Sequence, residues 1–161
     1  MKTHLTMVND LSTLKDARPG ALPIVATPGF LNLVTPQELL QLRESLLDGR
    51  PPRDLEVKLT QLAHGSLLHL FVEQNSRLII SLLVAAYSGE FRQANRTSLE
   101  RLLRVLAYVR KEDDATPDCR PDGYVDDQQE IRAMLSEMGD LLQSFKMWRL
   151  RHQVPEMWCS Q

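Results

Sequence analysis

Six aspartates crowd into segment 113–127, which reads DDATPDCRPDGYVDD and also holds two prolines and one glycine. Carboxylates this close together repel one another unless a positive charge offsets the repulsion. Ca²⁺ and Mg²⁺ prefer oxygen ligands, carboxylates among them, so a bound divalent cation is one way to offset this repulsion. The candidate metal ligands are Asp114, Asp118, Asp122, Asp126 and Asp127.

The resemblance of this segment to a calcium-binding loop is incomplete. A register that starts at Asp118 places aspartate or glycine at the first, fifth, sixth and ninth loop positions. The third position is then Arg120, and the twelfth is Gln129, where an EF-hand loop has a bidentate glutamate. Arginines near the segment offer a second way to neutralise the aspartates: Arg101, Arg104, Arg110 and Arg120.

A purely structural interpretation accounts for the same residues without a ligand. Aspartates beside prolines accept hydrogen bonds from nearby backbone N–H groups and so build turns. Gly123 supplies a backbone conformation that other residues avoid. Tyr124 can anchor the segment on the flanking helices, and Asp126 or Asp127 can cap the helix that follows. Both interpretations stay open at this point.

The elements that must position the segment have the periodicity of α-helices. TPQE at 35–38 predicts a helix start, because its threonine, proline and glutamate form a capping box. Asp54, Ser76 and Thr97 are the predicted caps of three further helices, and the apolar residues from Ile131 to Trp148 predict a long last helix. We therefore expect an all-α protein, a single-domain bundle of five to seven helices with an extended N-terminal arm.

Proline and glycine set the expected domain limits. The stretch RPGALPIVATPGF at 18–30 makes residues 1–34 an arm that lies across the helical body or across a partner. Residues 35–154 form the helical domain, and 155–161 form a tail. The end of this domain mixes aromatic, methionine and arginine residues, which are enriched where proteins meet partners. The candidate partner-binding residues are Trp148, Arg149, Arg151, Met157 and Trp158.

Residues 98–136 resemble the YkvA-like family of bacterial domains of unknown function. The family pattern is a helix, a loop close to D-x-I-P-D-x-I-P-x-x-G-Y-x-D-D, and another helix. The matching positions are Asp114, Pro117, Asp118, Gly123, Tyr124, Asp126 and Asp127. Cys119, Arg120 and Asp122 stand where the family, often membrane-associated, is usually apolar. The resemblance implies a helix–loop–helix shape and brings no established activity with it.

Composition limits the class of partner. A formal net charge of −2 over 161 residues argues against broad nucleic-acid binding, which needs a basic face. The longest apolar run, LIISLLVAAY at 78–87, gives about 15 Å of helix, too short for a hydrocarbon core of about 30 Å, so we expect no membrane span. The first ten residues lack the apolar run of a secretory signal, which predicts a cytoplasmic protein with reduced cysteines.

The sequence carries no phosphate-cradling, serine-hydrolase or zinc-protease motif. His69 and Glu73 share a helix face, but a histidine near an acid is more often a surface pair than two metal ligands. The leading interpretation is a non-catalytic protein that acts through a protein partner or as a homodimer, as an adaptor or regulator. The alternative is a divalent-metal-binding or metal-dependent hydrolytic protein that uses Ca²⁺ or Mg²⁺ at the aspartate-rich loop. A small-molecule ligand is left undetermined.

Overall fold

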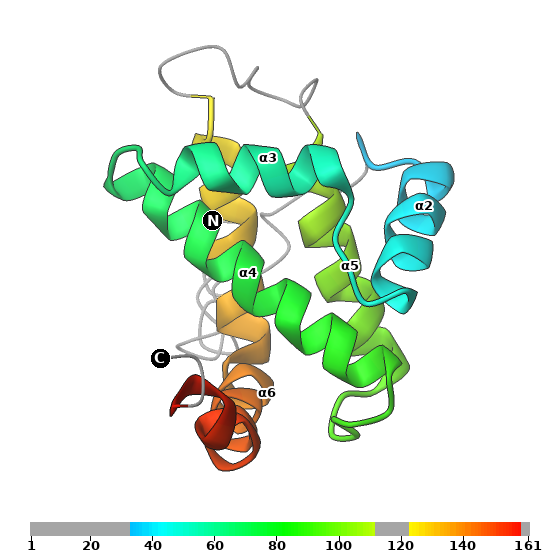
Figure 1. Cartoon of the computed structure of the whole chain (residues 1–161). Helices are drawn as coiled ribbons and strands as arrows, with labels where there is room; N and C mark the ends of the chain where they lie inside the picture. Colours follow the sequence, from blue (N-terminus) through cyan, green and yellow to red (C-terminus); the bar gives the residue numbers. More distant parts are fainter. Residues whose placement is uncertain (1–32, 112–122, 159–161) are drawn as a thin grey trace, which may run out of the picture.

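The structure is a computed structural model that describes residues 33–111 and 123–158, with side chains through 152. Within these ranges the chain is helical and contains no strand, which confirms the all-α prediction (Figure 1). The five helices are α2 (Pro36–Leu47), α3 (Arg53–Leu62), α4 (Leu67–Tyr87), α5 (Arg96–Arg110) and α6 (Val125–Trp158). The predicted arm, apart from its last two residues, lies outside the described residues.

The central element is α4, which packs against each of the other four helices. In Figure 1 it crosses the molecule diagonally, with α3 above it, α2 to one side and α6 running from top to bottom. Its inward side chains meet those of α5 and α6 in one apolar core. The fully buried apolar side chains on α4 are Val72, Ile79, Leu82 and Leu83.

The first capping box of the sequence is present. The Thr35 hydroxyl accepts a hydrogen bond from the Glu38 N–H at 3.2 Å, and the Glu38 carboxylate accepts one from the Thr35 N–H at 3.4 Å. Leu42 and Leu46 then face the core. The helix ends at Leu47, and Gly49 in the turn after it has a φ of +83°, which suits glycine and strains other residues. This helix confirms the prediction from TPQE.

The sequence predicted the wrong position for the break between α3 and α4. The prediction put Gly65 inside a helix and a cap at Ser76, but α3 ends at Leu62 and α4 begins at Leu67. Ser66 is the N-cap, and it exchanges hydrogen bonds with His69, which takes the place of the usual glutamate. Ser76 is buried in mid-helix. A Cβ at Gly65 would lie 2.1 Å from the His69 Nδ1, so the turn requires glycine.

Two further predicted caps are each wrong by two residues. The N-cap of α3 is Pro52, and Asp54 lies inside the first turn, where its carboxylate pairs with Arg110. The N-cap of α5 is Asn95 in place of Thr97, because the Asn95 Oδ1 accepts a hydrogen bond from the Ser98 N–H at 2.8 Å. Asparagine and threonine are both good caps, so composition alone could not choose between them.

The length argument against a membrane span does not hold. The run at 78–87 is part of α4, whose 21 residues make about 31 Å of helix. By length and composition α4 is the one helix in the described ranges that could cross a bilayer, with a mean hydropathy of 1.3. A buried core helix of a globular protein passes the same test, and α4 is the centre of this bundle. The expected absence of a span therefore stays a prediction.

The last helix is kinked and longer than predicted. Met138 has non-helical backbone angles (φ −120°, ψ 21°), so α6 consists of two helical segments joined there. The first segment buries Ile131 and Met134, and the second buries Leu142 and Phe145. The helix continues to Trp158, past the predicted end at 154.

Leu82→Ala tests the central role of α4. Leu82 is fully buried, so we expect a loss of about 2–5 kcal/mol in the free energy of unfolding, measured by chemical denaturation. The control is Leu67→Ala on the same helix, where the leucine is 85% exposed and the loss should stay below about 0.5 kcal/mol. Equal losses in both variants would contradict this arrangement.

Candidate functional site

The two ends of the aspartate-rich loop are joined by a buried hydrogen bond. The Tyr108 hydroxyl, near the end of α5, donates to the Asp126 Oδ2 at 2.5 Å in the first turn of α6. Both side chains are buried. A hydrogen bond to an ionised carboxylate is short and about twice as strong as one between neutral groups. This contact fixes α5 against α6 at the exit of the loop.

Lys58 holds the other end of the loop. Its Nζ, carried by α3, donates to the backbone oxygens of Val109 at 2.5 Å and of Lys111 at 3.1 Å. These are carbonyls at the end of α5, which lack partners within the helix and carry partial negative charge. The Nζ also lies 5.3 Å from the ring centroid of Tyr124, and that ring meets His69 edge-on at 5.1 Å. Tyr124, just before α6, therefore contacts both α3 and α4.

Three acids at the start of α6 are buried: Asp126, Asp127 and Glu130. The helix begins at Val125, so both aspartates lie in its first turn and neither occupies the predicted cap position. Acids are stabilised at this end by the helix dipole. Burial raises the pKa of Glu130; the charge of Arg101 opposes that shift, and the charges of Glu137 and Asp126 reinforce it.

Two of the four arginines expected to neutralise the loop have other partners. Arg101 makes two hydrogen bonds to the Glu137 carboxylate, at 3.1 and 3.3 Å. Arg110 pairs with Asp54 at 3.0 Å. The predicted surface pair of His69 and Glu73 is absent as well, because Glu73 instead binds Arg77 at 2.5 Å. Arg120 lies outside the described residues.

The candidate metal ligands divide into two groups. Asp126 and Asp127 lie in the interior, and one oxygen of Asp126 is taken by Tyr108. Asp114, Asp118 and Asp122 lie outside the described residues, so Ca²⁺ or Mg²⁺ binding there stays a prediction. Among the residues that are described, no three His, Cys, Asp or Glu side chains are placed to hold a metal ion.

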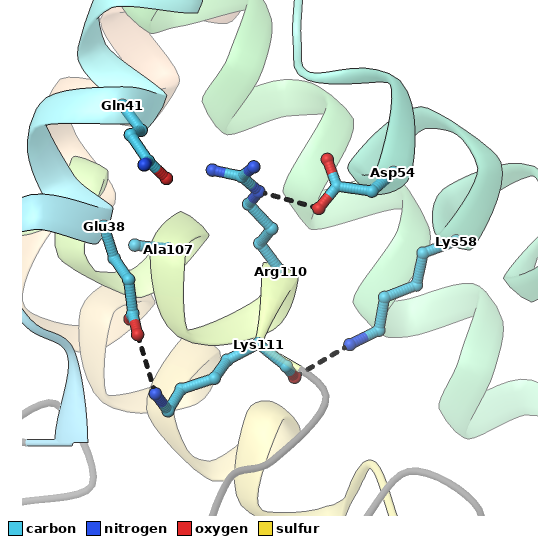
Figure 2. A pocket seen from close by; sticks show the side chains of 7 residues that line it. All are labelled: Glu38, Gln41, Asp54, Lys58, Ala107, Arg110 and Lys111. Carbon is cyan, nitrogen blue, oxygen red and sulfur yellow. Dashed lines mark hydrogen bonds and ion pairs between the residues drawn. The ribbon is translucent and has the colours of Figure 1, made fainter.

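A polar hollow of about 360 Å³ lies beside the start of the loop, where α2, α3 and α5 meet. Figure 2 shows its two ion pairs and the Lys58 ammonium, which points at the Lys111 carbonyl. Lys111 pairs with Glu38 at 2.8 Å, and Arg110 pairs with Asp54 at 3.0 Å. These pairs tie α2 and α3 to the end of α5, so the hollow serves to join helices.

The predicted partner-binding residues near the C-terminus are partly used by the fold itself. Trp148 is half-buried and stacks on Phe145 (5.7 Å between centroids, 19° between planes) and on His152 (4.8 Å, 23°). The Arg149 guanidinium lies 5.8 Å from the Phe145 ring centroid. Arg151 is exposed. Met157 and Trp158 fall in the last turn of α6, where side chains are not described, so their role stays a prediction.

Sequence reasoning missed an open groove of about 670 Å³ between α2 and α5, near the end of α4. Leu40 on its edge is 55% exposed, and Leu47, two turns further along α2, is 53% exposed. The sequence signal that could have indicated the groove is this pair of exposed leucines, which are seven residues apart. They lie outside the row of α2 leucines that faces the core. The lining residues are Pro36, Leu39, Leu40, Arg43, Tyr87, Arg96, Leu99, Glu100, Leu103 and Arg104.

Comparison of the chain with protein-family models, curated proteins and solved structures found no match. The resemblance of residues 98–136 to the YkvA-like family therefore stays a prediction.

Tyr108→Phe removes the hydroxyl that binds Asp126 and keeps the ring. We expect the free energy of unfolding to fall by about 1–3 kcal/mol, because a buried carboxylate loses a hydrogen bond. Tyr87→Phe is the matched control, since the Tyr87 hydroxyl makes no hydrogen bond to the part of the chain that is described. A Tyr108→Phe variant as stable as the control would contradict the assigned contact.

Glu130→Gln tests the burial of the acid cluster. The pKa of Glu130 is raised in the folded state, so the stability that its protonated form contributes is complete below pH 4.5, its ordinary value. That stability is lost as the pH rises through the raised pKa. We therefore expect the variant to be more stable than the parent at pH 7 and equally stable below pH 4.5. Thermal unfolding across this range measures the difference.

Asp140→Asn is the control for that experiment, because Asp140 is an exposed acid on the same helix. It should give no such pH-dependent gain. A Glu130→Gln variant that is less stable than the parent at pH 7 would show that the charged form of Glu130 is favoured by its surroundings.

Proposed function

We propose that this protein works by non-catalytic contact with a protein partner, as an adaptor or regulator, and that the groove between α2 and α5 is the contact surface. The observation that carries the proposal is an apolar hollow of about 670 Å³ bordered by exposed leucines. Exposing such leucines to water costs free energy that a partner can recover by covering them.

The composition of the groove supports contact with a partner. Its floor is apolar, with Leu39, Leu99 and Leu103 half-buried or buried, and its rim carries charged residues. An apolar centre inside a polar rim is the usual build of a protein interface. A second exposed leucine, Leu47, lies on the same helix outside the groove.

The groove is separate from the elbow, the name we give to the buried contacts of Tyr108 and Lys58. These polar contacts hold the helices together at one end of α5. The groove uses residues 96–104 of the same helix, nearer its other end. A partner can therefore bind to the groove while the contacts at the elbow remain intact.

Site-specific crosslinking tests the proposal. A photo-crosslinking amino acid in place of Leu40 should capture a discrete partner in extract of the source organism, or a second copy of this chain. The same amino acid in place of Leu67 is the control, because Leu67 is 85% exposed and does not line the groove. Leu40→Asp should abolish capture by a reporter placed at Arg43, without lowering the melting temperature.

A capture product at Leu40 and none at Leu67 would support the groove, and mass spectrometry of that product would separate a foreign partner from a homodimer. No product at Leu40, or the same products at both positions, would refute it.

A further inference from the structure

We infer that the segment bound by the groove is an acidic amphipathic helix of the partner. This inference rests on the proposed function, and it adds the chemistry of the occupant. It draws on three properties of the described residues: the charge of the rim, the line of exposed leucines, and the kind of secondary structure that forms the walls.

The rim of the groove is positively charged. Arg43, Arg96 and Arg104 line it together with one acid, Glu100. Glu100 pairs with Arg96 at 3.3 Å, and both side chains are largely exposed. Arg43 and Arg104 are exposed and form no ion pair with any residue that the structure describes. Two arginines on facing helices, in a protein of net charge −2, select for carboxylates on the occupant.

Two exposed leucines lie along α2. Leu40 borders the groove, and Leu47 lies beyond it on the same face of the helix, two turns and about 10 Å away. A partner helix that places leucines three, four and seven residues apart covers such a line from end to end.

The secondary structure around the groove indicates which kind of peptide it can bind. Addition of a strand needs a free sheet edge, and the described ranges contain no strand. Recognition of proline-rich segments needs a groove lined with aromatic side chains, and Tyr87 is the one aromatic residue here. Two helices with leucines between them are the arrangement that accepts a third helix.

Two labelled peptides test the inference by fluorescence anisotropy with the full chain. Each is an amphipathic helix of about four turns with leucines at i, i+3 and i+7. One carries glutamates beside the leucines, and the other carries lysines at the same positions. We expect the glutamate peptide to bind at least about ten-fold more tightly, with an affinity that falls as salt is added.

The double variant Arg43→Glu with Arg104→Glu should reverse the preference between the peptides. Both arginines are exposed, so the melting temperature should not change. Arg151→Glu is the matched control, because Arg151 is an exposed arginine on α6, outside the groove. It should leave the preference as it is.

Several outcomes would overturn the inference. Equal affinity for the two peptides would remove the charge argument, and loss of binding in Arg151→Glu alone would move the site to α6. Displacement of the glutamate peptide by dodecanoate at a lower concentration than by unlabelled peptide would make the occupant a lipid-like carboxylate.

The two proposals fail in different ways. If Leu40 still captures its partner in the Arg43→Glu, Arg104→Glu background at full yield, the acidic helix is wrong and the contact surface stands. If Leu40 captures nothing, the contact surface itself is wrong.

Discussion

The hydrogen bond between Tyr108 and Asp126 allows an acid to be buried where two helices change direction. A carboxylate in the interior loses its hydration, so it requires donors, helix dipoles or positive charge close by. Here the donor comes from α5, the dipole from the start of α6, and a lysine from α3 neutralises the end of α5. Four of the five described helices therefore meet at this elbow, since α4 contributes His69 against Tyr124.

The charges of the molecule fall into two kinds of environment. In the polar hollow of Figure 2, acids and bases are matched within the protein and hold helices together. In the groove, Arg43 and Arg104 lie at the surface beside leucines and form no ion pair with any residue that the structure describes. Charges that are already paired within the protein gain little from a ligand. Unpaired arginines beside exposed apolar surface favour a ligand that carries a carboxylate.

Local signals in the sequence predicted the fold class and the first capping box, because helical periodicity and caps depend on near neighbours along the chain. The break at Gly65 escaped prediction because it depends on the side chain of His69 approaching the glycine within one turn. The burial of Asp126 and Asp127 escaped prediction for a longer-range reason: the side chain that binds Asp126 is Tyr108, which lies 18 residues earlier in the chain and on another helix. The groove forms only when α2 and α5, about 60 residues apart, lie side by side, and no pattern within either helix predicts that neighbour.

The ion pair between Glu38 and Lys111 links the two regions through a single turn of α2. Glu38 binds the residue that ends α5, and Leu39 and Leu40, its next neighbours, line the groove. A ligand that changes the separation of α2 and α5 must therefore also change the geometry of that pair. If a ligand in the groove shifts that pair, a second ligand that shifts the pair in turn changes the affinity of the groove, because coupling between two binding sites is reciprocal.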